Sequence, residues 1–456
     1  MSGDDVREHL DQQALEAVSR LQLSALDKSL PAAAAGRSVA GFLSSGPRLS
    51  AFSTPLLVLT DAVLEDNVDQ MAAWCSEKGV GLAPHGKTTM APTLWDRQLR
   101  AGAWGITVAT PSQLRVAIDF GVRRVQLANA LVDPAALAWV SRALDADPSL
   151  QLLTWADSVD TIAAMDAVLN RLRPRRALRV LVELGAVGGR TGARSLETAE
   201  AVAAALGSSP WLRLGGVSGY EGALAHDASD AGLRTVRTYL EDMATLHRKL
   251  LASGAYGRAH GNADDSADDG AEVVVTAGGS AYFDDVADVL GDLSDPEGKA
   301  GLPTRVLLRS GAYVVHDDGF YRGISPFSRG AGEPLRSAMH AWTRVVSRPE
   351  PGLALLDAGK RDVPFDEGLP EPQLVADQLG ATTRTLTGGQ ITAVNDQHSF
   401  LRIDPAGTAS DLRVGDVVRL GLSHPCTAFD KWQWIPVIAD DDATDPVVVD
   451  LVRTYF

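Results

Sequence analysis

Residues 80–92 read Val-Gly-Leu-Ala-Pro-His-Gly-Lys-Thr-Thr-Met-Ala-Pro, an apolar run that stops at Pro84-His85-Gly86 and then presents one lysine, Lys87. A helical pattern resumes near Leu94. Two mechanisms could use this lysine. Gly81–Thr88 formally satisfies the nucleotide-binding P-loop pattern, Gly-x-x-x-x-Gly-Lys-Thr. Alternatively, a lysine at the mouth of a barrel strand can carry a Schiff base.

The pattern that begins at this stretch decides the fold. From residue 80 onward, strand-like apolar runs alternate with helical patterns, always in the same order. Repeated β–α units indicate a parallel sheet with helices packed outside it, and eight units close a barrel. The sequence therefore predicts a (β/α)8 TIM-type barrel. The eight runs are Val80–Ala83, Gly105–Ala109, Val125–Ala128, Gln151–Trp155, Arg179–Leu184, Leu212–Ser218, Glu272–Thr276 and Arg305–Leu308.

The rhythm changes after about Gly330, where short alternating runs are separated by Gly, Pro and Asp turns. This pattern is typical of a mainly antiparallel β domain. We therefore expect an N-terminal helical leader and linker at 1–49, a barrel domain at 50–330 and a β domain at 331–456. Residues 253–271 are acidic and rich in Gly and Ala, and we expect them to form a disordered insertion in the barrel domain.

The composition excludes several classes of function. A net charge of −16 over 456 residues argues against a nucleic-acid or anionic-membrane surface, because such surfaces need clustered Lys and Arg. The two cysteines, Cys75 and Cys426, are far apart, so a disulfide framework is not expected. The acidic N-terminus is unlike a secretory signal, and no window approaches about 18 uninterrupted apolar residues. We expect a soluble cytoplasmic protein.

Polar and glycine-rich segments follow several predicted strands, at the end of a barrel where chemistry gathers. The turn Gly278-Gly279-Ser280 suits a phosphate, because glycines let backbone N–H groups approach an anion and the next helix adds a positive dipole. The other segments are His85-Gly86-Lys87, Gly185–Gly192 with Arg190, Ser218–Gly222 with Tyr220, and Arg309–Tyr313.

Neither nucleotide motif fits its required context. A P-loop needs a buried strand before its first glycine, but residues 73–79 read as a helix end and Gly81 lies within the strand. Pro84 has no N–H to offer a phosphate. The glycines at 185–192 do not have the Gly-x-Gly-x-x-Gly spacing of a dinucleotide site. Considered alone, Arg190 is equally consistent with a surface ion pair.

His424 and Cys426 lie two residues apart in a segment that we expect to be extended, so both side chains would point to the same side. Histidine nitrogen and thiolate sulfur suit Zn²⁺, and two protein ligands leave room for water and substrate. A structural histidine beside a buried cysteine is the alternative, and the sequence leaves the metal open. His398 is expected to be structural.

Residues from about 50 to 440 resemble the D-serine dehydratase/D-threonine aldolase family, which comprises pyridoxal-phosphate enzymes of the alanine-racemase-like fold type. The chain departs from the family's pattern at Ala223, where histidine is usual, and at Ala281-Tyr282, where small hydroxyl residues and proline are usual. The motifs that carry the resemblance are His85-Gly-Lys87-Thr88, Gly-Arg190-Thr-Gly, Tyr220-Glu-Gly, Gly278-Gly279-Ser280, Gly311-Ala-Tyr313-Val, Asp357-Ala-Gly359-Lys360 and His424-x-Cys426.

This resemblance implies that Lys87 carries pyridoxal 5'-phosphate as a Schiff base. Arg190 would contact the phenolic oxygen of the cofactor ring, and Tyr220 would line the cofactor pocket. The resemblance also implies a homodimer in which the β domain of one subunit closes the barrel mouth of the other. The phosphate would be held by Gly278, Gly279, Ser280 and Tyr313, and Zn²⁺ or another divalent metal by His424 and Cys426.

The implied activity is dehydration of D-serine or a related 3-hydroxy-D-amino acid to an α-keto acid and ammonia. Lys87 would take the α-proton, and a metal Lewis acid would assist loss of the β-hydroxyl. Removal of the hydroxyl proton would instead break Cα–Cβ, as in an aldolase. The family's dehydratases carry His-x-Cys and its aldolases tend to carry His-x-Asp, so Cys426 favours dehydration. A non-catalytic pyridoxal-phosphate-binding protein is the alternative from another class, and a racemase is disfavoured because no tyrosine is evident as the opposite-face base.

Overall fold

The computed structural model describes residues 9–257, 272–299, 301–441 and 443–456. Residue contacts group the chain into two compact units. The first unit comprises Ala72–Lys87 and Leu99–Gly311, and the second comprises Leu10–Met71, Thr88–Gln98 and Ala312–Phe456. Each unit is built on its own sheet.

The first unit contains an eight-stranded parallel sheet in the order β2-β9-β8-β7-β6-β5-β4-β3. Its two end strands are also joined, because Trp104 N–H donates to Leu82 O (2.7 Å) and Thr107 N–H donates to Pro84 O (2.9 Å). A parallel bridge between His85 and Thr107 completes the ring. The predicted eight-stranded barrel is confirmed. Its strands are β2 (Gly81–Leu82), β3 (Ile106–Val108), β4 (Arg124–Ala130), β5 (Gln151–Ala156), β6 (Leu178–Leu184), β7 (Leu212–Gly219), β8 (Val273–Ala277) and β9 (Thr304–Leu308).

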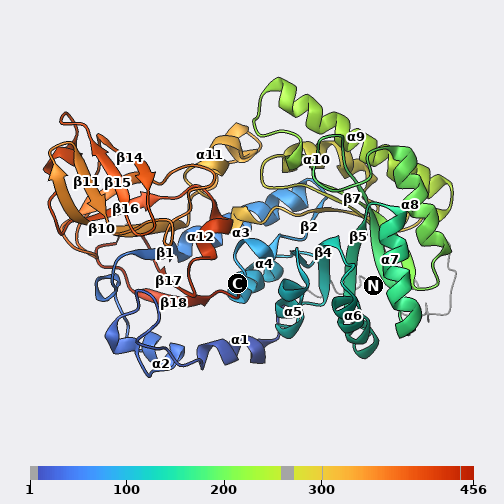
Figure 1. Cartoon of the computed structure of the whole chain (residues 1–456), viewed down its shortest axis with the longest axis horizontal. Coiled ribbons are helices and arrows are strands. Elements are labelled where there is room, and N and C mark those ends of the chain that lie inside the picture. The colour runs from blue at the N-terminus through green and yellow to red at the C-terminus, as the bar shows by residue number, and fades with distance from the viewer. Residues whose placement is uncertain (1–8, 258–271, 300, 442) are drawn as a thin grey trace. The chain divides into compact units, whose positions relative to one another are not determined.

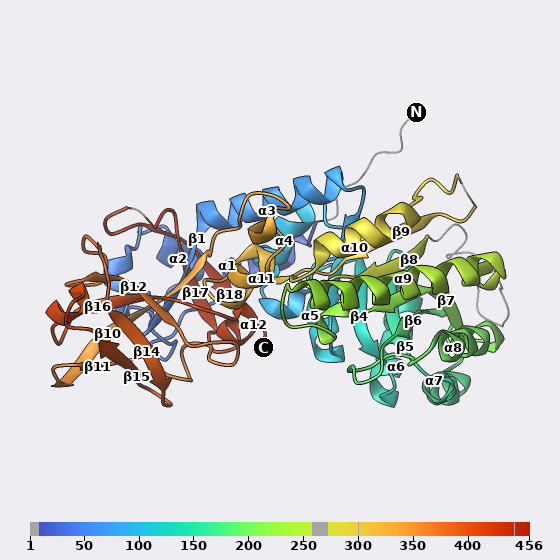
Figure 2. The same ribbon diagram turned by 90° about the horizontal axis from the view of Figure 1, so that it is seen from above.

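Helices cover the outside of these strands (Figures 1 and 2). Several of them begin after a Ser, Thr or Asp whose side chain accepts a hydrogen bond from the backbone N–H three residues later. This contact satisfies one of the unpaired donors of the first turn. The helices of this unit are α5 (Pro111–Asp119), α6 (Pro134–Ala146), α7 (Val159–Leu172), α8 (Leu196–Ser208), α9 (Asp230–Ala252) and α10 (Phe283–Leu290). Two further helices, α3 (Asp61–Glu77) and α4 (Pro92–Arg100), span residues of both units.

Side chains fill the barrel, so its interior is a packed core and no pore. Strands β7 and β8 approach closely at Gly216, where a Cβ would lie 1.8 Å from the Val274 carbonyl oxygen. Gly216 also has φ +144°, which other residues rarely adopt. The buried cluster at the centre consists of Ala83, Trp104, Leu153, Trp155, Leu181, Val274 and Leu307.

The second unit holds a ten-stranded, mostly antiparallel sheet, which confirms the predicted β domain. Its β1 pairs antiparallel with β10 and parallel with β17, so this strand joins the β sheet although it precedes the barrel in the chain. The sequence patterns did not predict β12 or β18. The strands are β1 (Leu56–Thr60), β10 (Met339–Glu350), β11 (Leu353–Leu356), β12 (Glu371–Ala376), β13 (Arg384–Thr385), β14 (Gly389–Val394), β15 (Ser399–Ile403), β16 (Val417–Gly421), β17 (Trp434–Ile438) and β18 (Val448–Arg453).

The division into domains at 1–49, 50–330 and 331–456 stays a prediction, and the contact units above are cut differently. In the predicted leader, the described residues include helices α1 (Gln12–Ser19) and α2 (Val39–Leu43). Of the predicted insertion at 253–271, Ala255–Gly257 form a short 3-10 helix, and 258–271 lie outside the described residues. No helix in the described part of the chain has the length and apolar character needed to cross a membrane.

Candidate functional site

Lys87 lies in a short 3-10 helix, Gly86–Thr88, that follows β2 in the first unit. Two residues earlier, burial holds the pKa of His85 well below its usual value, and the charges of Lys87, Arg309 and Arg190 lower it further. A neutral imidazole therefore stands among three cations. This end of the barrel has the positive potential that suits an anionic ligand.

Arg309 follows β9 directly and ties the ends of other strands together. Its buried guanidinium donates to Thr276 Oγ1 (2.8 Å) in β8 and to the Gly219 carbonyl at the end of β7. It also lies 4.8 Å from the centroid of the Trp155 ring in β5. Burial lowers the pKa of Arg309, and the Glu221 carboxylate opposes that shift.

The Gly278-Gly279-Ser280 turn after β8 already binds an anion, which belongs to the chain itself. The N–H groups of Gly278 and Gly279 donate to Glu221 Oε2 (2.9 Å) and Oε1 (2.7 Å). Glu221 is completely buried. A phosphate bound by these two amides would compete with Glu221, so phosphate binding by Gly278, Gly279 and Ser280 stays a prediction.

Arg190 and Tyr220, two of the predicted cofactor-binding residues, lie side by side. The Arg190 guanidinium lies 4.8 Å from the centroid of the Tyr220 ring. The same ring borders the glycine turn, since a Cβ on Gly279 would lie 3.1 Å from it. Arg190 and Tyr220 also line a pocket of about 250 Å³, open solvent included.

Tyr239 of α9 fixes the position of Tyr220. Its hydroxyl donates to Leu184 O (2.6 Å) at the end of β6 and accepts from Tyr220 N–H (3.0 Å). Burial raises the pKa of Tyr239, so the hydroxyl keeps its proton for this contact. In the same region, Glu183 Oε1 accepts from Thr191 Oγ1 (2.6 Å) beside Arg190.

The first unit fits pyridoxal phosphate. Several buried polar atoms lack a hydrogen-bond partner among the described residues, and they include His85 Nδ1, Trp155 Nε1 and Ser218 Oγ. An unpaired buried polar group costs about 1–3 kcal/mol, so several together indicate a place where a ligand or water binds. Lys87 supplies the amine for an aldehyde, and the cations supply charge for a phosphate. Tyr313 is buried in the second unit, and its predicted phosphate contact stays a prediction.

The predicted extended conformation holds at His424 but is wrong at Cys426. His424 is the N-cap of a short helix, α12 (Pro425–Phe429), and Cys426 lies in its first turn. Proline at the first helical position favours a helix start, because its φ is preset and it lacks an N–H that would be unpaired there. Burial lowers the pKa of His424, but Cys426 and Asp366 raise it more, to about 9.

Both candidate metal ligands contact polar residues of the second unit. Asp366 Oδ2 lies 2.7 Å from His424 Nδ1, and Asp366 Oδ1 accepts from Thr427 Oγ1 (2.7 Å). Cys426 Sγ lies 3.6 Å from Oγ1 of Thr88, which is buried and follows Lys87 in the chain.

This donor set fits a divalent metal with two protein ligands. An imidazole and a thiol stand together, which is chemistry that Zn²⁺ favours. Within the described ranges no group of three or more His, Cys, Asp or Glu could hold a metal ion. Water and substrate would therefore complete the coordination. His398 is exposed, in the turn between β14 and β15.

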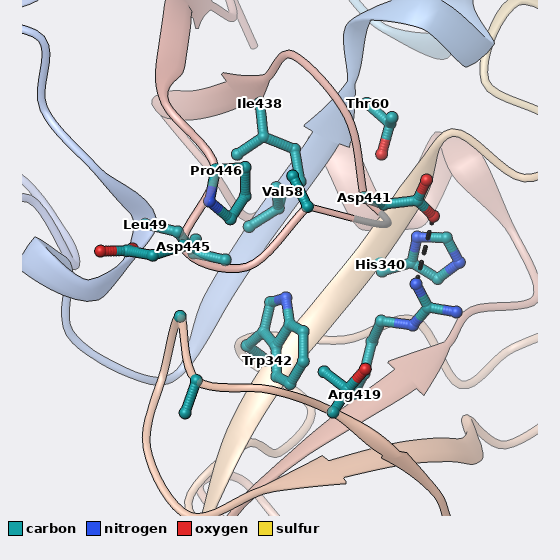
Figure 3. A pocket seen from close by; sticks show the side chains of 14 residues that line it. Leu49, Val58, Thr60, His340, Trp342, Arg419, Ile438, Asp441, Asp445 and Pro446 are labelled. Atoms are coloured by element: carbon teal, nitrogen blue, oxygen red, sulfur yellow. Dashed lines mark hydrogen bonds and ion pairs between the residues drawn. The ribbon is translucent and has the colours of Figure 1, made fainter.

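A separate pocket in the second unit contains none of the predicted site residues (Figure 3). It lies over β1, β10 and β16, where Trp342 is paired with Arg419. Its charges are already paired: Arg419 with Asp441 (3.2 Å), and His340 with Asp318 (3.3 Å). We interpret it as packing space between the sheet and its covering loops.

Two curated relatives align with most of the chain. D-threonine aldolase of Arthrobacter sp. is 26% identical over 405 residues, covering 88% of this chain and 93% of the relative. D-threo-3-hydroxyaspartate dehydratase of Delftia sp. (strain HT23) is 26% identical over 411 residues, covering 86% and 96%. A family model for a serine dehydratase domain matches residues 338–438.

Solved structures share the fold. D-threonine aldolase from Filomicrobium marinum has a TM-score of 0.70 at 21% identity, covering 90% of this chain and 97% of that one. Alanine racemase of Clostridium difficile 630 has a TM-score of 0.57 at 12% identity, covering 89% and 99%. D-threo-3-hydroxyaspartate dehydratase is represented by a cysteine-to-alanine variant in the metal-free form and by a variant with histidine replaced two positions earlier.

The parallel barrel and the following antiparallel domain define an alanine-racemase-like fold. Lys87, its surrounding cations and the His424–Cys426 pair stand on that fold. The chain is similar to members of the D-threonine aldolase/3-hydroxyaspartate dehydratase family.

Sequence analysis gave no role to several residues that shape the site. Arg309 could have been found, because a charged residue directly after a buried strand is a recognisable signal. Glu221 lay within a quoted motif, yet its contact with the glycine turn joins residues 57 positions apart. Tyr239 and Asp366 act through contacts at similarly long range, for which periodicity offers no signal.

Proposed function

We propose that the protein is a pyridoxal-phosphate-dependent D-amino-acid dehydratase that acts on D-serine or a related 3-hydroxy-D-amino acid. The carrying observation is the His424–Cys426 pair, with Asp366 on the imidazole. A D-threo-3-hydroxyaspartate dehydratase has a histidine and a cysteine at the same spacing, and its cysteine variant is described as metal-free. By that correspondence, His424 and Cys426 hold Zn²⁺ or another divalent metal.

The chain's own residues divide the work. Pyridoxal phosphate, when bound, withdraws electrons from the substrate's α-carbon. Lys87 Nζ is the primary amine that takes the α-proton. Arg190 and Tyr220 orient the cofactor ring. The phosphate would be held by Gly278, Gly279, Ser280 and Tyr313.

Loss of the α-proton and of the β-hydroxyl together amounts to loss of water. A divalent metal at His424 and Cys426 supplies a Lewis acid for the hydroxyl oxygen. Hydrolysis of the resulting enamine then gives the α-keto acid and ammonia. The D-configuration of the substrate is inferred from the names of the relatives.

Retro-aldol cleavage is the second candidate, because D-threonine aldolase of Arthrobacter sp. matches 88% of the chain. In that reaction a base removes the hydroxyl proton, Cα–Cβ breaks, and glycine and an aldehyde form. The cofactor-binding residues would have the same roles in both reactions. The reactions differ at the β-hydroxyl, which leaves in the dehydration and loses only its proton in the retro-aldol cleavage.

The test uses purified protein loaded with pyridoxal phosphate and Zn²⁺. D-serine, D-threonine and 3-hydroxy-D-aspartate are each incubated with it, with the L-enantiomers as controls. Keto acid with stoichiometric ammonia supports the dehydratase. Glycine plus aldehyde without ammonia would move the assignment to the aldolase. A visible cofactor absorption that is unchanged in Lys87→Ala would overturn the cofactor site itself.

We further propose that the protein is a homodimer, as the resemblance to this family implies. Light scattering coupled to size-exclusion chromatography measures the mass directly. A monomer that turns over D-serine at the same specific activity at every concentration would contradict the dimer.

A further inference from the structure

We infer that Asp366 is a positioning residue for the metal: it fixes the His424 ring so that Nε2 presents its lone pair to the ion. Thr427 in turn holds the Asp366 carboxylate. This inference rests on the proposed function, because it requires that His424 and Cys426 hold a divalent metal.

Asp366 is held from two directions. Its Oδ2 lies 2.7 Å from His424 Nδ1, and its Oδ1 accepts the Thr427 hydroxyl at 2.7 Å. Asp366 belongs to the long connection between β11 and β12, whereas Thr427 and His424 belong to the start of α12. The carboxylate therefore locks a loop onto the helix that carries both candidate ligands.

The choice of nitrogen decides the chemistry. A carboxylate on Nδ1 requires a proton on that nitrogen, so the neutral ring has its lone pair on Nε2. Metal-binding histidines commonly show this pattern, in which the carboxylate orients the ring and increases its basicity as a ligand. Cys426 interacts with the same imidazole, so the thiol and the ring can share one ion.

Other histidines in the described part of the chain are held differently. His340 uses Nε2 for its contact with Asp318 (3.3 Å). His247 Nδ1 contacts the Tyr256 hydroxyl (3.0 Å), a neutral group. Neither contact places a carboxylate on Nδ1, as Asp366 does at His424.

Asp366→Ala, Asp366→Asn and the control Glu367→Gln test the inference in the pyridoxal-phosphate-loaded protein. Glu367 is exposed and follows Asp366 directly, so Glu367→Gln removes one negative charge from the same loop. Zn²⁺ affinity is measured by competition with a chromophoric chelator. Co²⁺ substitution adds a spectroscopic signature, since thiolate-to-cobalt absorption reports coordination by Cys426.

We expect Asp366→Ala to weaken Zn²⁺ binding about 10–100-fold, the range seen when such outer partners are removed. Asp366 is 40% exposed, so the loss should fall near the lower end. The Zn²⁺ affinity of Asp366→Asn should lie between those of Asp366→Ala and wild type, because an amide oxygen still accepts from Nδ1–H but carries no charge. Thr427→Val should weaken Zn²⁺ binding less than Asp366→Ala does, and Thr427→Ser, which keeps the hydroxyl, should bind Zn²⁺ as wild type does. The control Glu367→Gln should have unchanged Zn²⁺ affinity. The thiolate-to-cobalt band should be unchanged, because Cys426 still binds the ion.

Wild-type Zn²⁺ affinity in Asp366→Ala would overturn the positioning role while leaving the proposed function in place. Complete loss of metal, equal to that in His424→Ala, would make Asp366 a ligand and also overturn the inference. Equal Zn²⁺ affinity of wild type and Cys426→Ala would instead remove the metal from the proposed function, and the inference with it.

Discussion

The Tyr239 hydroxyl connects the ends of two barrel strands, because it donates to Leu184 O and accepts from Tyr220 N–H. Tyr220 is a predicted cofactor-binding residue, so Tyr239 acts on the site without being assigned a contact with the ligand. Such residues make a site rigid: the side chain that touches the cofactor is only as well placed as the backbone that carries it.

Tyr239→Phe should lower the free energy of unfolding by about 1–3 kcal/mol, because the buried Leu184 carbonyl and the partly buried Tyr220 N–H lose their partner. It should also weaken pyridoxal phosphate binding, since Tyr220 is no longer fixed. Tyr256→Phe is the control, because it removes a tyrosine hydroxyl from a half-buried contact with His247. Denaturant unfolding and cofactor titration provide the two measurements. Equal cofactor affinity in both variants would contradict the positioning role of Tyr239.

Cys426→Asp should shift the products from D-threonine toward aldehyde and glycine at the expense of ammonia. The substitution replaces a soft sulfur ligand by a carboxylate that can also act as a base near the β-hydroxyl. The ratio of ammonia to aldehyde measures the effect. Cys426→Ala serves as the control for simple loss of the metal. An unchanged ratio in a variant that still binds metal would show that Cys426 does not choose the outcome.

At the scale of elements, Asp317 shows how a short helix is anchored. Its Oδ1 accepts from the N–H groups of Gly319 (3.0 Å), Tyr321 (2.9 Å) and Arg322 (3.3 Å) at the start of α11 (Phe320–Ile324). Its Oδ2 is buried without a partner in the described part of the chain. Burial outweighs the three donors and raises the pKa of Asp317 to about 7.

This raised pKa predicts a pH dependence. Between about pH 4 and pH 7 the unfolded chain has released the proton that the folded protein still holds, so stability falls as pH rises and levels off above 7. Asp317→Asn removes this titration. At roughly 1.4 kcal/mol per pKa unit, the free energy of unfolding of the variant should increase relative to that of wild type by on the order of 2–4 kcal/mol between the lower and the upper end of that window. Thermal unfolding of both proteins measures the difference at about pH 4.5 and 6, which lie within that window, and at about pH 8, which lies above it. A constant difference would contradict the assigned pKa.

The elements that could be predicted are those with a dense local signal. Most barrel strands contain an apolar run that is buried on both faces, so they are identifiable without knowledge of their partners. Strand β12 begins Glu371-Pro372-Gln373, which lacks that signal, and its place beside β16 depends on distant residues. The start of α12 was misjudged because Pro425 was considered part of an extended segment and not a helix start.

At the scale of the whole molecule, segments distant in sequence complete the second unit. Lys28, from the predicted leader, pairs with Asp362 (2.7 Å), whose side chain is 2% exposed, and lies 3.6 Å from the centroid of the Trp432 ring. Part of the predicted leader therefore contributes to the second unit. Sequence analysis predicted a helical leader and linker here, without a contact to the β domain.

Lys28→Met should destabilise the protein by about 1–3 kcal/mol, because a buried carboxylate loses its cation. The loss stays moderate because Asp362 also accepts from Gly359 N–H and Gln397 Nε2. Lys299→Met, which breaks an exposed pair with Glu297, is the control and should have little effect. Chemical denaturation measures both. Equal effects of the two substitutions would show that the leader adds no stability through Lys28.

The ring of eight strands closes at β2, which is two residues long, and Lys87 lies five residues after that strand's last residue. The join depends on a few backbone hydrogen bonds, including the one from Thr107 N–H to Pro84 O. Opening of this seam would release the segment that carries Lys87, so the placement of this lysine depends on the closure of the barrel. The rate at which the Thr107 amide proton exchanges with solvent deuterium is therefore also a measure of how firmly the protein holds Lys87.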